Sequence, residues 1–215
     1  MKYKLIVFDI DGTITKHISS WRYIHEALNL WDALAFKYQE QFLKGSISYR
    51  KFCELDAAHW KGLEDAKLRG VFKDVPYSKN VKPCILKLKK LGFKLVALST
   101  GLQYIANRVK NELNFDYVIS NRLNVYKGRL TGGVTINISH GGKGSVMKKI
   151  IKNFHIKPSE VIVVGDSAGD ISLARHAGYS IAFNSSDEEF SQIVNYECKT
   201  NDFMEIFRKI EGFLA

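Results

Sequence analysis

The sequence predicts an α/β protein: a doubly wound, Rossmann-like parallel sheet with a small helical cap inserted after the first strand and a β-hairpin flap. Three observations predict this fold. Short apolar runs, typical of strands that are buried on both faces, recur along the chain. Helix-length segments separate most of these runs, and such alternation implies a parallel sheet with helices on both faces. Residues 16–75 and 121–138 interrupt the alternation.

The first strand is predicted from Leu5-Ile-Val-Phe8, an apolar run that stops at two carboxylates and a glycine. Similar runs predict five strands in all, at residues 4–8, 94–99, 116–120, 160–165 and 179–183. A helical stripe of apolar residues predicts a helix over residues 81–91, which ends before Gly92. Another helix is expected over residues 144–154.

The first interruption, residues 16–75, holds all three tryptophans and no good strand, so we expect a helical insertion. Ser20 or Ser19 is a suitable N-cap, and Gly45 a suitable end for the second helix. The first helix should contain Trp21, Ile24, Leu28 and Trp31.

The second interruption alternates around Lys127-Gly128-Arg129, which predicts a β-hairpin. Together these elements divide the chain into an α/β catalytic core, residues 1–15 and 76–215, and a helical cap, residues 16–75.

Composition narrows the class of protein. Of the 215 residues, 46% are hydrophobic and 25% are charged, as in ordinary globular domains. The apolar runs are too short to span a membrane and the N-terminus lacks a secretion signal, so we expect a cytoplasmic protein. The net charge of +10 favours anionic partners, but the basic residues are spread out and no recognition motif accompanies them. We therefore expect neither nucleic-acid nor membrane binding.

The cysteines, Cys53, Cys84 and Cys198, are widely spaced and never form a Cys-x-x-Cys arrangement. This spacing indicates neither a disulfide framework nor a zinc site, and it favours buried free thiols.

Polar residues that can carry chemistry follow the predicted strands. Asp9 and Asp11 come directly after the first strand, and side chains two apart in an extended segment point the same way. Ser99-Thr100-Gly101 follows the second strand, Gly142-Lys143-Gly144 precedes a helix, and Gly165-Asp166 with Asp170 follows a later strand. In open α/β sheets, ligands bind at this carboxyl edge of the strands.

Carboxylates, a hydroxyl and an ammonium at one edge are suited to magnesium-assisted phosphoryl transfer. Because Mg²⁺ prefers hard oxygen ligands, we expect it to be held by Asp9, Asp166 and the backbone carbonyl of Asp11. Asp9 can attack phosphorus to give an aspartyl-phosphate, because the metal and Lys143 offset the charge repulsion. Asp11 can protonate the leaving oxygen and then take a proton from water.

Phosphate binding is assigned to Ser99, Lys143 and the backbone around Ile10, Asp11 and Thr100, because such donors stabilise phosphoryl oxygens. Asp170 is better placed to orient Lys143 or a metal-bound water than to bind the metal itself.

The four signals, in this order, resemble the motifs of the haloacid dehalogenase superfamily, and most of all those of its phosphoserine phosphatase branch. Phe8-Asp-Ile-Asp-Gly-Thr13 matches the first motif, Ser99 the second, Lys143 the third, and Gly165-Asp166 with Asp170 the fourth. The stretch from Asn121 to Gly132 is similar to the hairpin of that branch. The resemblance covers nearly the whole chain and implies a Mg²⁺-dependent phosphatase that acts on a small phosphorylated metabolite.

The residues that would contact substrate differ from those of the phosphoserine phosphatase branch. Its glutamate in the early cap corresponds to Ile18, and its arginine in the second cap helix falls near Asp56. Its asparagine before the last aspartate corresponds to Gly169. Trp21 and Tyr49 are further candidates for substrate contact. An apolar residue at position 18 with an indole nearby suggests a leaving group that is more apolar and less zwitterionic than serine. Other basic or polar residues could replace the arginine: Arg50, Lys51 or His59.

Alternatives remain open at this stage. A phosphate-binding P-loop is excluded, because it requires Ser or Thr where Gly144 stands and Gly where Asn137 stands. A phosphoaspartate-forming regulatory domain would use similar residues, but it places its aspartate after a middle strand and usually lacks a cap. A non-catalytic basic module leaves the acidic residues unexplained. A phosphatase for a sugar phosphate or a nucleotide fits the same motifs.

Overall fold

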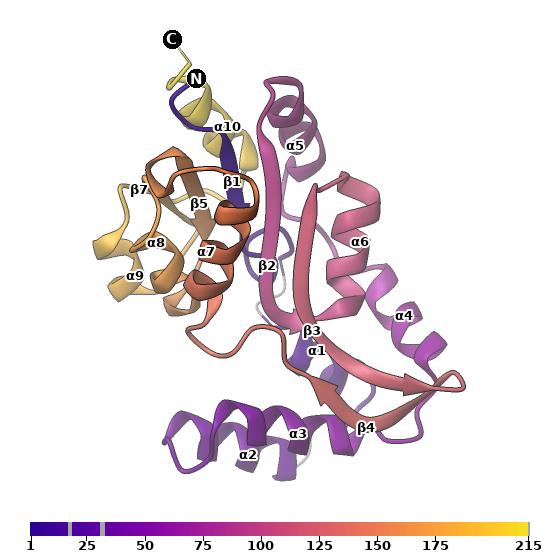
Figure 1. The fold of residues 1–215 in the computed structure, drawn as a ribbon. Coiled ribbons are helices and arrows are strands. Elements are labelled where there is room, and N and C mark those ends of the chain that lie inside the picture. The colour runs from indigo at the N-terminus through magenta and orange to yellow at the C-terminus, as the bar shows by residue number, and fades with distance from the viewer. Residues whose placement is uncertain (17–18, 31–32, 215) are drawn as a thin grey trace.

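The computed structural model describes residues 1–16, 19–30 and 33–214. In these residues seven strands form one sheet in the order β4-β3-β2-β1-β5-β6-β7, parallel except for β4 (Figure 1). The strands are β1 (Leu5–Phe8), β2 (Lys94–Leu102), β3 (Tyr117–Tyr126), β4 (Arg129–Thr135), β5 (Val161–Gly165), β6 (Tyr179–Phe183) and β7 (Tyr196–Cys198).

Ten α-helices and two short 3-10 turns connect the strands in the described residues. The helices are α1 (Ser20–Ala27), α2 (Ala33–Leu43), α3 (Tyr49–His59), α4 (Asp65–Lys73), α5 (Val81–Lys90), α6 (Gln103–Leu113), α7 (Lys143–Asn153), α8 (Ile171–Ala174), α9 (Glu188–Ile193) and α10 (Phe203–Glu211), and the turns are η1 (Pro158–Glu160) and η2 (Ala168–Asp170). None of the described helices is long and apolar enough to cross a membrane.

Strand β1 is central and buried on both faces, which explains its unbroken apolar run. It pairs in parallel with β2 on one side and β5 on the other. Ile6 and Phe8 pack into a core formed with α5, α6 and α10, and Leu5 and Val7 into a second core formed with α7 and α8. The predicted doubly wound sheet is therefore confirmed.

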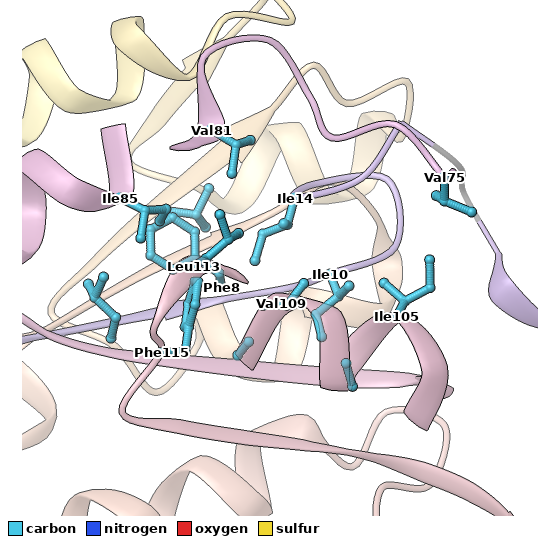
Figure 2. Close-up of a cluster of buried hydrophobic side chains, with 14 of the residues drawn as sticks. Phe8, Ile10, Ile14, Val75, Val81, Ile85, Ile105, Val109, Leu113 and Phe115 are labelled. Carbon is cyan, nitrogen blue, oxygen red and sulfur yellow. The ribbon is translucent and has the colours of Figure 1, made fainter. Parts of the chain in front are cut away.

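Phe8 sits at the centre of the larger core. Its ring meets that of Phe115 edge-on, with centroids 5.8 Å apart, and Ile85 and Leu113 lie beside them (Figure 2). Ile10 and Ile14, in the loop after β1, extend the same cluster (Figure 2). The apolar side chains that flank Asp9 and Asp11 therefore anchor this loop to the core.

The predicted helical insertion after β1 is confirmed: α1 to α4 lie between β1 and β2 in sequence (Figure 1). Ser19 is the N-cap of α1, and its Oγ accepts a hydrogen bond from the Arg22 N–H at 3.3 Å. Gly45, at φ +72°, follows the end of α2 as expected. Helix α3 packs against β4, so the insertion contacts the hairpin.

Helix α1 is shorter than predicted. Leu28 is its C-cap rather than a helical residue, because Asn29 adopts a left-handed conformation at φ +52° and ends the helix. Trp31, expected in this helix, lies outside the described residues.

The strand expected at residues 116–120 is longer than predicted, because β3 runs on into the hairpin. The hairpin turn at Lys127 and Gly128 has positive φ at both residues, 46° and 76°, which matches the right-handed twist of the strands. Edge strand β7 was not predicted.

Candidate active site

Asp9 lies at the carboxyl edge of the central strand. Its N–H donates to the Val164 carbonyl at 2.9 Å, so the β1–β5 ladder continues to this residue. The loop then turns at Gly12, where φ is +88° and where a Cβ would overlap the Asp166 carboxylate. Thr13 closes the turn by donating from Oγ1 to Asp166 Oδ1 at 3.1 Å. A glycine is required here because the first and fourth motifs approach so closely.

Lys143 links two of the carboxylates. It begins α7, and its Nζ donates to Asp9 Oδ1 at 2.5 Å and to Asp170 Oδ1 at 2.7 Å. All three residues are buried. Burial acts to lower the pKa of Lys143, but the Asp170 and Asp9 carboxylates outweigh it and raise this pKa above its ordinary value. The amine is therefore held as an ammonium next to Asp9.

Asp9, Asp166 and Asp170 form an acidic triad whose carboxylate oxygens lie within 4.8 Å of one another. Burial raises the pKa of all three, to about 6 for Asp170, and the Asp9 charge further raises that of Asp166. Three ionised carboxylates against the single Lys143 ammonium leave two negative charges uncompensated. A divalent cation would balance these two negative charges, and carboxylate oxygens are the donors that hard cations prefer. The donor set thus fits a divalent metal.

Asp170 uses both of its oxygens within the protein. Oδ1 accepts from Lys143, and Oδ2 accepts from the Asp166 N–H at 3.1 Å. This arrangement suits the role expected from the sequence, in which Asp170 orients Lys143.

The Asp11 carboxylate lies at the N-terminus of α1. Its Oδ2 accepts from the Ser20 hydroxyl at 2.8 Å and from the Ser20 N–H at 3.1 Å. The first N–H groups of a helix have no intrahelical partner and attract negative charge, so this end of α1 is a suitable site for a carboxylate. Burial raises the pKa of Asp11, while the two Ser20 donors act to lower it.

The end of β2 brings the second motif to the same place. The β2–β3 register shifts between Leu98 and Leu102, and within this irregular stretch Ser99 Oγ accepts from the Gly101 N–H at 2.7 Å. A Cβ on Gly101 would overlap oxygen atoms of Asp11, Ser20 and Ser99. The side chains of the first and second motifs therefore converge on Gly101, where only glycine fits.

The carbonyl of Thr100 joins the cap to the core. It accepts hydrogen bonds from Trp21 Nε1 at 3.0 Å, Tyr49 OH at 3.0 Å and Asn121 Nδ2 at 2.9 Å. Asn121 is fully buried and also donates to the Ile138 carbonyl. The motif at the end of β2 is thus held by α1, α3 and β3 together.

A cavity of about 190 Å³ lies beneath the cap. Three of the residues proposed to contact substrate, Trp21, Tyr49 and Asp56, line it together with Thr100. Ile18, the fourth, lies outside the described residues. The residues considered as replacements for the family arginine are not among the described residues that line it: Arg50, Lys51 and His59.

Three contributors to the site were missed by sequence reasoning. Ser20 was considered only as a helix cap, yet it binds Asp11. Thr13 binds Asp166, and Asn121 binds Thr100. The position of Thr13 at the end of the first motif was an available signal, whereas the contacts of Ser20 and Asn121 depend on the fold.

Comparison with known proteins agrees with this geometry. The family model of the haloacid dehalogenase-like hydrolases matches residues 6–175. A phosphoserine phosphatase from Idiomarina loihiensis is 30% identical over 203 residues, which cover 94% of this chain and 91% of that protein. A phosphoserine phosphatase from Archaeoglobus fulgidus is 31% identical over 185 residues. This match covers 86% of this chain but only 53% of the Archaeoglobus protein.

Solved structures show the same similarity. A substrate-bound phosphoserine phosphatase complex has a TM-score of 0.84 and 26% identity, and the match covers 97% of this chain and 99% of that one. A phospho-aspartyl intermediate analogue of phosphoserine phosphatase has a TM-score of 0.82 and 27% identity, with the same coverage.

Proposed function

The chain belongs to the haloacid dehalogenase-like hydrolases, and we propose that it hydrolyses a small phosphate monoester through an aspartyl-phosphate on Asp9. The observation that carries this proposal is the Asp9 carboxylate at the end of β1, bonded to the Lys143 ammonium within the acidic triad. A relative of known structure is described as a phospho-aspartyl intermediate analogue, which supports the same chemistry.

In the first step an Asp9 oxygen attacks phosphorus, and the bond from phosphorus to the alcohol oxygen breaks. Lys143 reduces the repulsion between the anionic nucleophile and the phosphate, because its charge lies 2.5 Å from Asp9 Oδ1. The Ser99 hydroxyl and the backbone N–H groups at Ile10, Asp11 and Thr100 donate to the phosphoryl oxygens.

Asp11 acts as the acid and then as the base. It gives its proton to the leaving alcohol oxygen, and it then takes a proton from the water that attacks the phosphorus of the aspartyl-phosphate. The products are the free alcohol, inorganic phosphate and regenerated Asp9. Ser20 holds the Asp11 carboxylate for both transfers.

We assign Mg²⁺ as the metal, held by Asp9, Asp166 and the Asp11 carbonyl, because hard oxygen donors beside a phosphate favour it. When bound, it would offset the negative charge of the phosphate and the triad. Asp170 orients Lys143. Residues 16–75 would act as a cap that closes over the substrate before attack.

The test is phosphate release from a panel of phosphorylated amino acids, sugars, nucleotides and small alcohols, with Asp9→Asn as the control for contaminating phosphatases. We expect Mg²⁺-dependent turnover that is lost in Asp9→Asn. Asp11→Asn should still bind substrate but lose most of its turnover, by about a hundredfold or more. Stoichiometric phosphorylation of the protein without turnover would instead support a regulatory phosphoaspartate, and unchanged activity in Asp11→Asn would contradict the acid/base role.

A further inference from the structure

The cavity beneath the cap has an aromatic wall. Trp21 from α1, Phe42 from α2, and Tyr49 and Phe52 from α3 all line it. The Phe42 ring stacks on Phe52 with centroids 5.2 Å apart and meets Tyr49 at 5.7 Å. These four residues, the aromatic wall, line one small space.

The polar ends of this wall are already bonded. Trp21 Nε1 and Tyr49 OH both donate to the Thr100 carbonyl, so the hydrogen-bonding groups of these side chains are turned to the core. Trp60 stacks on Trp21, with ring centroids 5.7 Å apart. The wall therefore presents mainly carbon surface to the cavity.

The same cavity holds one buried carboxylate. Asp56 lines it and is only 3% exposed, and its Oδ1 has no hydrogen-bond partner among the described residues. The buried His25 faces this carboxylate, with its Nε2 3.4 Å from Asp56 Oδ1. Arg22 also lines the cavity, but it is exposed and pairs with Glu26 at 2.6 Å, one helical turn away. The buried charged side chain among the described residues that line the cavity is therefore a carboxylate.

The cavity adjoins the reaction centre. Thr100 lines it and follows Ser99 directly, and Ser19, at its rim, precedes the Ser20 that binds Asp11. An ester with its phosphate at Asp9 would direct its alcohol part into this space. At about 190 Å³ the cavity has room for about six water-sized groups, enough for a small alcohol with a bulky cationic head.

We propose that this cavity binds a quaternary ammonium group, so that the preferred substrate is the phosphate ester of a choline-like alcohol; this inference rests on the proposed function. Ring faces within about 6 Å attract such a cation through their quadrupoles, and Asp56 supplies the counter-charge. A primary ammonium would need acceptors for three N–H donors, and the aromatic wall offers none, whereas a quaternary ammonium needs no acceptor. Among the described lining residues, side-chain acceptors are found on Ser19, Gln39 and Asp56. The carboxylate of phosphoserine would meet Asp56 and be repelled.

The decisive comparison uses two esters of the same shape. The wild-type protein with Mg²⁺ is assayed with phosphorylcholine and with 3,3-dimethylbutyl phosphate, in which an uncharged carbon replaces the nitrogen. A desolvated cation binds to aromatic rings about tenfold or more tightly than an uncharged group of the same shape. We therefore expect kcat/KM for phosphorylcholine to be at least about tenfold higher than that for the neutral ester. Phosphoserine should be hydrolysed more slowly than either.

Substitutions test whether Asp56 causes the preference for phosphorylcholine over the neutral ester. Asp56→Asn should lower kcat/KM for phosphorylcholine about tenfold and change that for the neutral ester far less. Glu54→Gln is the matched control, because it removes the same charge from an exposed position on the same helix and should change neither value. Inhibition by tetramethylammonium but not by neutral tert-butyl alcohol is the second readout.

The outcomes separate the two proposals. Equal rates for the two isosteric esters, or a preference for phosphoserine, would overturn the quaternary-ammonium inference while leaving the phosphatase proposal intact. Absence of any Asp9-dependent hydrolysis across the panel would overturn both.

Discussion

The contact between Ser20 and Asp11 gives the sharpest prediction about how the cap controls the chemistry. The Ser20 hydroxyl donates to Asp11 at 2.8 Å and accepts from the Leu102 N–H at 2.9 Å, and Ser20 is buried. In Ser20→Ala both hydrogen bonds are lost, so the half-buried Asp11 carboxylate and the buried Leu102 N–H each lose a partner. One lost bond involves a carboxylate, so we expect the free energy of unfolding to fall by about 2–4 kcal/mol.

For a chain of this length that loss corresponds to a decrease in Tm of about 5–15 °C. The Asp11 carboxylate would retain only the Ser20 N–H as a described donor, and its displacement should lower kcat by about tenfold to a hundredfold. Urea unfolding, followed by circular dichroism, measures the first effect, and steady-state phosphate release measures the second.

Ser48→Ala is the control, because Ser48 caps α3 through its Oγ and lies away from the acidic triad. Ser48→Ala should lower the free energy of unfolding by about 1 kcal/mol and leave kcat unchanged. If Ser20→Ala is no less stable than Ser48→Ala and keeps full activity, then Ser20 does not hold Asp11 and the reasoning fails.

Three further predictions follow from the same geometry. Asp170→Asn should lower kcat about tenfold to a hundredfold with little change in Tm, because Lys143 loses its second carboxylate; full activity would remove Asp170 from the positioning role. EDTA should abolish phosphate release and added Mg²⁺ should restore it, so activity that persists in EDTA would contradict the metal assignment. Asn121→Ala should reduce the free energy of unfolding in urea by about 2–4 kcal/mol, since it removes bonds to Thr100, Tyr49 and Ile138; a change within error would refute this.

The central strands could be predicted because a strand that is buried on both faces consists of an unbroken run of apolar residues. Strand β1 contains only apolar residues, and each of its faces packs against a different helical layer. Strand β7 has no such apolar run. It has only three residues and lies at the edge of the sheet, where Tyr196 and Glu197 are half-buried. Strand β3 was predicted too short because its second half leaves the core and joins the hairpin.

The reacting groups could be predicted because parallel strands end at the same edge. Asp9 and Asp166 directly follow strands and Ser99 lies near the end of β2, so their proximity follows from topology alone. Ser20 could not be found in this way, because its contact with Asp11 depends on how α1 returns over β2. The cavity around Asp56 likewise combines residues of three cap helices and Thr100, which no local pattern brings together.

In the proposed reaction Asp9 carries the phosphoryl group during turnover. To detect this group, the wild-type protein is mixed with Mg²⁺ and excess substrate and quenched in acid within the first turnover, and the modified residue is located by peptide mass spectrometry. We expect one phosphoryl group on the peptide that contains Asp9, at the carboxylate bonded to Lys143. An unmodified Asp9 during rapid phosphate release, or a phosphoryl group on another residue, would contradict it.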